Sequence, residues 1–85
     1  MGVQIPSNMY APHYFKGNIL LLANDRQPKN GERIIFSAGD NLWIAEYKEE
    51  NGEKNFYSIR DGRKRGNNKD IQYILGYIAT HIEGI

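Results

Sequence analysis

The sequence predicts a small, mainly β protein of short twisted strands and hairpins, with little or no helix. Short apolar, β-branched and aromatic runs alternate with turn residues along the chain. Asn51-Gly52 lies between two such runs, and this dipeptide is the strongest short-range signal for a β-hairpin. With 85 residues there is room for one domain, which we expect over residues 1–85, with 1–6 as a flexible start.

The first two strands are predicted from apolar runs that end in turn residues. Residues 19–23 follow a turn at Gly17 and read as a strand buried on both faces. A loop with a proline and a turn at Gly31 comes next, because proline fixes φ and glycine accepts positive φ. Residues 32–37 are β-branched and aromatic, and they predict the second strand.

The segment from residue 42 is ambiguous by itself. Asp40 or Asn41 could cap a helix there, but the Asn51-Gly52 turn favours two strands over residues 42–50 and 53–59. We therefore predict a hairpin.

A polar, glycine-rich segment follows at residues 60–70 and is predicted to be an exposed loop. Its basic residues suggest nucleic-acid binding, but we favour a solvated loop because no aromatic residues lie among them to stack on bases. These basic residues are Arg60, Arg63, Lys64, Arg65 and Lys69.

The last predicted strand, residues 71–82, is apolar on both faces. Strict alternation places Ile74, Ile78 and Ile82 on one face with Gly76 and Thr80. We expect the other face to point outward and to contact a partner, because a small domain rarely has core enough for both; the alternative is that one core covers both. The candidate interface residues are Tyr73, Leu75, Tyr77, Ala79 and His81.

Composition narrows the possible functions. The net charge is +1, from 11 basic and 10 acidic residues, so no overall field draws the chain to nucleic acid or an anionic membrane. The chain has no cysteine and two histidines, which excludes disulfide frameworks and thiolate metal sites. The longest apolar run, residues 19–23, is too short to cross a bilayer. We expect a cytoplasmic protein without metal, cofactor or membrane contact.

Five segments in order carry a resemblance to a known family. They are 8–12 (NMYAP), 17–22 (GNILLL), 31–36 (GERIIF), 42–47 (LWIAEY) and 74–78 (ILGYI). Their order and spacing resemble the C-terminal, peptidase-like domain of the LexA and phage lambda repressor family. That family opens with Ser-Met-x-Pro, and its active members cleave themselves with a serine and a lysine. The resemblance covers nearly the whole chain from residue 6 and implies a small LexA-like β-fold.

The reactive residues of that family are missing here. Asn8, or Met9 if the extra residue is placed differently, occupies the expected serine position, and Ala45 occupies the lysine position. A residual dyad of Ser7 with Lys48 is an alternative, but Lys48 has an odd offset from Ala45 and points to the opposite sheet face. We therefore expect no catalytic residue and no enzyme activity.

The resemblance implies a catalytically inactive dimerisation domain of a phage-type or SOS-type transcriptional repressor. Such a domain pairs with itself, or with another repressor-type protein, and DNA is bound only through a missing N-terminal domain. Tethering two weakly binding domains raises operator affinity by about 10²–10⁴ without new DNA contacts. Two other functions stay open at this stage: a residual self-cleaving peptidase, and a small β-barrel nucleic-acid-binding protein using the basic loop at 60–70.

Overall fold

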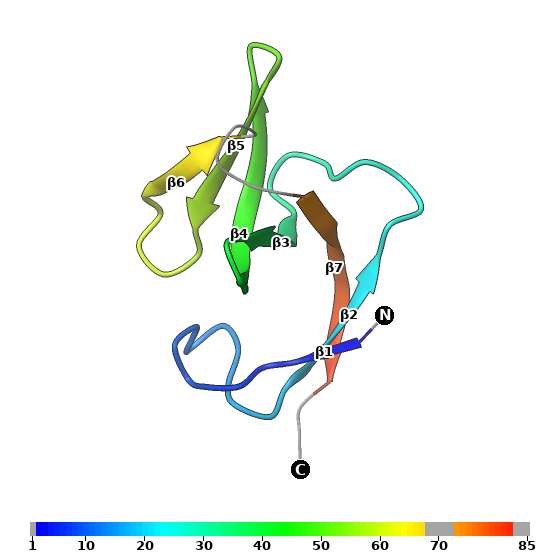
Figure 1. Ribbon diagram of the computed structural model, residues 1–85, viewed down its shortest axis with the longest axis vertical. Helices are drawn as coiled ribbons and strands as arrows, with labels where there is room; N and C mark the ends of the chain where they lie inside the picture. The colour runs from blue at the N-terminus through cyan, green and yellow to red at the C-terminus, as the bar shows by residue number, and fades with distance from the viewer. Residues whose placement is uncertain (1, 68–72, 83–85) are drawn as a thin grey trace.

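The computed structural model describes residues 2–67 and 73–82, and seven β-strands and no helix lie within these ranges (Figure 1). The mainly β fold class is thereby confirmed. The strands are β1 Gly2–Gln4, β2 Ile19–Ala23, β3 Arg33–Ala38, β4 Asn41–Glu50, β5 Glu53–Ser58, β6 Lys64–Asn67 and β7 Tyr73–Ile82. Within the described residues, no helix is long and apolar enough to cross a membrane.

The strands form one antiparallel sheet in the order β1-β2-β7-β3-β4-β5-β6. Strand β7 is last in sequence but pairs with β2 on one side and β3 on the other, so it joins the two halves of the sheet. In Figure 1, β1 and β2 lie with the C-terminal end of β7 in the lower part of the molecule, and β5 and β6 lie in the upper part.

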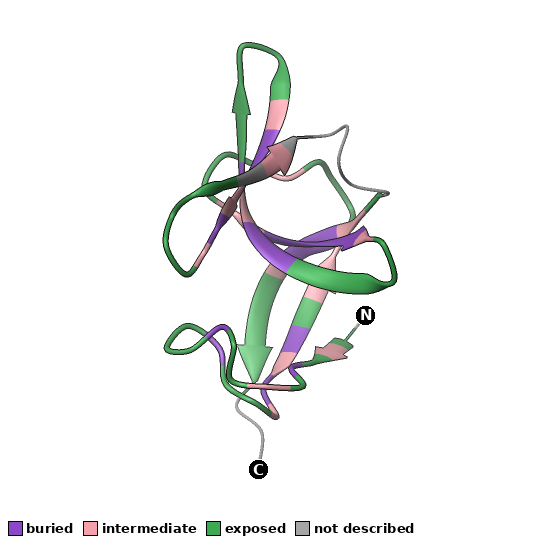
Figure 2. Ribbon diagram, turned by 60° about the vertical axis from the view of Figure 1, so that its left-hand side comes forward, coloured by how far each residue is buried: buried purple, intermediate pink, exposed green. Residues whose placement is uncertain are grey.

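The core consists of two apolar clusters because successive side chains of β3 and β4 point to opposite faces. Figure 2 shows the buried residues concentrated in the middle of the sheet. The N-terminal cluster contains Ile5, Tyr10, Tyr14, Leu20, Ile35 and Ile44. The hairpin cluster contains Ile34, Phe36, Ala45, Tyr47, Phe56 and Tyr77.

The central hairpin forms as predicted. Glu50 pairs with Glu53 across a two-residue turn, and the turn residues Asn51 and Gly52 have φ values of 52° and 78°. Positive φ at both central residues is the requirement of a type I′ turn, whose twist matches that of the flanking strands. The predicted turn at Gly31 also has positive φ, 88°.

Two predictions near the ends of the sheet are wrong in part. Strand β2 occupies the predicted residues, but Leu21 is 36% exposed, so the strand is not buried on both faces. The predicted loop at 60–70 contains β6, which pairs with β5 through Gly66 and Phe56. Backbone pairing with β5 thus overrides the polar composition of this segment; residues 68–70 lie outside the described ranges.

Strand β7 carries two register shifts that break its alternation. Phe36 pairs with Ile74 and Ile35 with Gly76, so Leu75 is an extra residue opposite β3. Ala79 is likewise the extra residue opposite β2, between the partners of Leu21 and Leu22. Each extra residue moves the following side chains to the other face of the sheet. The predicted residues 71 and 72 lie outside the described part of this strand.

Candidate functional site

The predicted interface residues of β7 do not share one exposed face. Tyr77 is 9% exposed in the hairpin cluster, while Leu75 packs against the N-terminal cluster on the opposite side. Tyr73, Ala79 and His81 are exposed, but the His81 ring contacts Tyr14 edge-on, with the ring centroids 5.4 Å apart. The common outward face is therefore wrong, because the two register shifts were not foreseen from the sequence.

The residues that do point outward together come from the three neighbouring strands β1, β2 and β7. Ile19 pairs with Ile82 and with Gln4, and Leu21 pairs with Thr80 and with Gly2, so these six residues lie on one face of the sheet. We call it the terminal-strand face. Ile82 is 50% exposed and Leu21 is 36% exposed, whereas Ile19 is partly covered. None of the six residues is charged, and the face presents the aliphatic side chains of Ile19, Leu21 and Ile82 beside the polar side chains of Gln4 and Thr80.

Gly2 leaves the β1 edge of this face without a side chain. A methyl group on Gly2 would lie 3.6 Å from Ile19 Cγ2 and 3.8 Å from Leu21 Cδ2, so the position borders the two aliphatic side chains directly. With no side chain on Gly2, both aliphatic groups stay open to an approaching surface. The terminal-strand face was missed from the sequence because strict alternation assigned Thr80 and Ile82 to the core.

The segment in the expected nucleophile position has a structural role. The Lys16 N–H donates to Asn8 Oδ1 over 2.8 Å, which closes the loop that precedes β2. The loop then docks on the sheet through Tyr10, whose hydroxyl accepts from the Ile44 N–H at 3.2 Å. This amide lies next to the last β4–β5 pair, Ala45 with Ser58. The Tyr10 hydroxyl therefore supplies a hydrogen-bond acceptor to β4 just beyond the end of its pairing with β5.

Ala45 lies in the hairpin cluster and is 1% exposed. Its cross-strand partner Ser58 lines an apolar pocket that Met9 also lines, so the two ends of the expected dyad lie near the same pocket. Neither position carries a hydroxyl or an amine. The pocket therefore lacks the nucleophile and the base at the places where the family resemblance puts them.

The alternative dyad of Ser7 and Lys48 is held in other contacts. The Met9 N–H is directed at Ser7 Oγ at 3.4 Å, a local turn contact two residues along the chain. Lys48 Nζ lies 3.8 Å from Glu46 Oε1 and 5.2 Å from the centre of the Tyr57 ring. Lys48 is exposed while Ala45 is buried, as expected for an odd offset along a strand.

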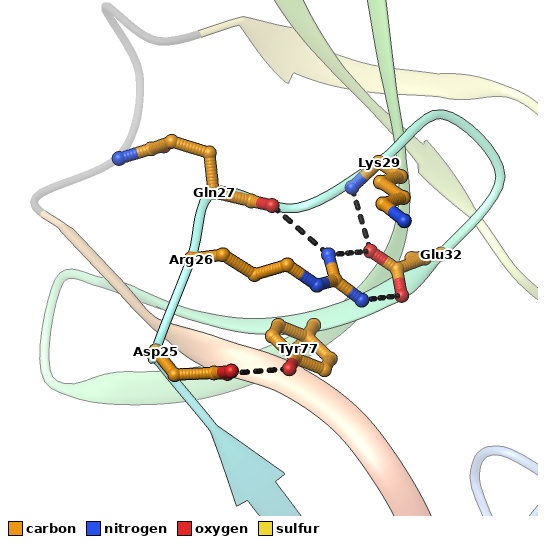
Figure 3. Close-up of polar contacts among 6 residues, drawn as sticks. All are labelled: Asp25, Arg26, Gln27, Lys29, Glu32 and Tyr77. Atoms are coloured by element: carbon orange, nitrogen blue, oxygen red, sulfur yellow. Dashed lines mark hydrogen bonds and ion pairs between the residues drawn. The ribbon is translucent and has the colours of Figure 1, made fainter.

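A cluster of polar contacts, which we call the clasp, holds the β2–β3 loop on β7. It consists of Asp25, Arg26, Lys29 and Glu32 from the loop and Tyr77 from β7, and Figure 3 shows them side by side. The Tyr77 hydroxyl donates to Asp25 at 2.5 Å, and the Arg26 guanidinium lies 4.0 Å from the centre of the Tyr77 ring. Arg26 also donates to both carboxylate oxygens of Glu32, each over 2.8 Å, and the Lys29 N–H donates to Glu32 over 2.6 Å. The clasp explains why Tyr77 is directed into its own chain.

These contacts shift the titration of the clasp residues. The hydrogen bonds from Arg26 and from the Lys29 amide lower the pKa of Glu32 from 4.5 to about 2. The hydrogen bond from Tyr77 lowers the pKa of Asp25, and the same bond raises the pKa of Tyr77. All three shifts favour the charge states seen at neutral pH, in which both carboxylates accept hydrogen bonds. The clasp is therefore a stabilising contact near neutral pH.

Among the described residues, no group of three or more His, Asp or Glu side chains is placed to hold a metal ion. Comparison with protein-family models, with curated proteins and with solved structures found no significant match to this chain.

Proposed function

We propose that this chain is a pairing module that joins two copies of itself without cleaving them. In this proposal it serves as the C-terminal part of a phage-type or SOS-type repressor, and a separate domain contacts DNA. The resemblance of the sequence segments supports the repressor assignment. The exposed, uncharged terminal-strand face, with Leu21 and Ile82 on it, supports pairing, and it is the observation that carries the proposal.

The chemistry of the terminal-strand face suits a protein partner. The cores of protein interfaces are depleted in charged residues, and none of the six residues of this face is charged. In a two-fold pair the face meets its own copy, so aliphatic side chains such as Leu21 and Ile82 would cover one another. Because this contact needs no opposite charges, identical copies are compatible partners.

The absence of cleavage in this proposal rests on the residues near the pocket. Self-cleavage by a serine and lysine needs a hydroxyl beside an unprotonated amine. Asn8 uses its amide oxygen to close a loop, and Ala45 contributes a methyl group to the core. The proposed module therefore holds a copy of itself through β1, β2 and β7, with no reaction at the pocket.

The pairing proposal is tested by placing a charge at the centre of the terminal-strand face. We expect the wild-type chain at about 100 µM to sediment as a dimer and Leu21→Glu to sediment as a monomer, because an unpaired carboxylate would be buried on pairing. Leu42→Glu is the matched control, since Leu42 is a strand leucine 49% exposed on β4, outside this face. It should remain a dimer.

Either of two results would contradict pairing through this face. One is a wild-type chain that stays monomeric at several times that concentration, about 500 µM. The other is a Leu21→Glu variant that dimerises as tightly as the Leu42→Glu control. Circular dichroism of both variants checks that each carboxylate leaves the sheet folded, since both replaced leucines are solvent-exposed on strands.

A further inference from the structure

The pocket beside the N-terminal loop has aromatic walls and room for a small molecule. Phe36 and Phe56, at 7% and 0% exposure, contribute buried aromatic surface, while Met9 and Trp43, at 41% and 38%, remain open to solvent. Its volume is about 210 Å³. Drug-sized ligands occupy pockets of about 300–1,000 Å³, so the volume here selects a smaller ligand.

The polar groups of the pocket are few and favour a negative charge. Arg60 is the only charged residue among the described residues that line it. Ser58 also lines the pocket, is 6% exposed, and its Oγ accepts from the Arg60 N–H at 3.1 Å. The Ser58 hydroxyl can therefore donate its own hydrogen to a ligand oxygen. A guanidinium and a hydroxyl donor together suit a carboxylate.

We propose that this pocket binds a small apolar carboxylic acid, with its hydrocarbon part against Phe36, Trp43 and Phe56 and its carboxylate toward Arg60 and Ser58. Charge complementarity with Arg60 decides the ligand class, because a cationic ligand of the same shape would meet a like charge. Binding would cover the exposed surfaces of Met9 and Trp43. The proposal goes beyond pairing, since the pocket lies between the N-terminal loop and β3–β6 and includes no residue of the terminal-strand face.

Trp43 supplies the measurement, because it is the single tryptophan of the chain and lines the pocket. Three probes share a phenylpropyl body and differ in charge: hydrocinnamate, phenylpropanol and phenylpropylamine. Tryptophan can be excited at wavelengths where these phenyl groups do not absorb. For a ligand of this size we expect hydrocinnamate to bind with a Kd of about 0.1–1 mM. The alcohol should bind about tenfold more weakly, and the amine more weakly still.

Arg60→Gln removes the positive charge that Arg60 brings to the pocket and keeps a polar side chain. We expect it to weaken hydrocinnamate binding about tenfold, to the level of the alcohol, and to leave alcohol binding unchanged. Arg60→Lys should retain most of the preference for the acid. Arg63→Gln is the matched control: it removes the same charge from the same β5–β6 connection, but Arg63 does not line the pocket.

Three results would overturn the ligand proposal. They are the absence of a saturable Trp43 response below about 10 mM, equal affinity for acid and amine, and an equal effect of Arg60→Gln and Arg63→Gln. The monomeric Leu21→Glu variant separates this proposal from the pairing proposal. It should bind hydrocinnamate with wild-type affinity, because Leu21 does not line the pocket. Failure of pairing therefore leaves the ligand proposal standing, and failure of ligand binding leaves the pairing proposal standing.

Discussion

Replacing Gly76 with alanine tests a close backbone approach between β2 and β7. Gly76 lies in the middle of β7, between the two register shifts. A methyl group there would lie 2.6 Å from the carbonyl oxygen of Ala23 and 3.4 Å from Leu22 Cβ, both on the neighbouring strand β2. The first distance is far below ordinary van der Waals contact, and a backbone carbonyl cannot rotate away as a side chain can. Strands β2 and β7 must therefore separate locally.

The size of the effect follows from this overlap. Extra methyl groups in a packed interior cost about 1–3 kcal/mol of unfolding free energy. Because β7 joins the two halves of the sheet, the displacement also disturbs its pairing with β3. We expect a loss of about 2 kcal/mol, which lowers the Tm of a domain of this size by roughly 8–16 °C.

Urea unfolding followed by Trp43 fluorescence measures this loss, and an unchanged slope with denaturant would show that the surface exposed on unfolding is the same. Gly2→Ala is the matched control, because its methyl group would meet only side-chain atoms at 3.6 and 3.8 Å. It should change stability by less than about 0.5 kcal/mol. A Gly76→Ala protein as stable as Gly2→Ala would refute the close approach of β2 and β7.

Two further changes probe the hairpin cluster and the clasp. Phe56→Ala, at a fully buried ring that contacts Phe36 and Tyr47, should cost about 3–5 kcal/mol in urea unfolding; a loss below about 1.5 kcal/mol contradicts this packing. The pKa of Glu32 is lowered from 4.5 to about 2. Its contribution to the free energy of unfolding is therefore full above pH 4.5 and is lost as the pH falls toward 2. Solvent screening limits it to about 1 kcal/mol. Glu32→Gln should flatten the stability profile across that window, and parallel profiles for the two proteins would contradict the clasp.

The parts of the fold predicted correctly are those determined by local chemistry. The Asn51-Gly52 turn specifies its own backbone conformation, so the two flanking strands follow from a few adjacent residues. Strand β2 was also predicted with its bounds, because its short apolar run ends at polar turn residues. Neither prediction required knowledge of residues distant in the sequence.

The outward face of β7 could not be predicted in the same way, because it depends on pairing with two distant strands. The shifts at Leu75 and Ala79 arise between β7 and its neighbours, and each one reverses the faces of the residues that follow. One local signal was present: an isolated glycine inside a strand, here Gly76, indicates a bulge or a close backbone approach. A bulge near Gly76 reverses the alternation of the residues after it, so this signal argued against placing Tyr77 on the same face as Tyr73 and Leu75.

Strand β6 was missed for a related reason. Lys64 and its neighbours are polar and glycine-rich, which is typical of a loop, but an edge strand needs only backbone pairing and little apolar surface. The tight connection before it, in which the Ser58 N–H donates to the Arg63 carbonyl at 2.8 Å, brings the segment back beside β5. Charged residues on an edge strand also discourage pairing with other chains, so the proposed pairing is expected at the opposite end of the sheet.

The surroundings of Ala45 give a physical reason why a lysine at this position would cost folding free energy. A lysine side chain at this position would start inside a cluster that includes Ile34, Tyr47 and Phe56, where burial lowers the pKa of an amine. A catalytic base requires that lowered pKa, but a buried amine costs folding free energy when it has no partner. Alanine removes this cost. In the proposed non-cleaving module, alanine thus keeps the packed core that a buried base would strain, in line with the general trade between activity and stability.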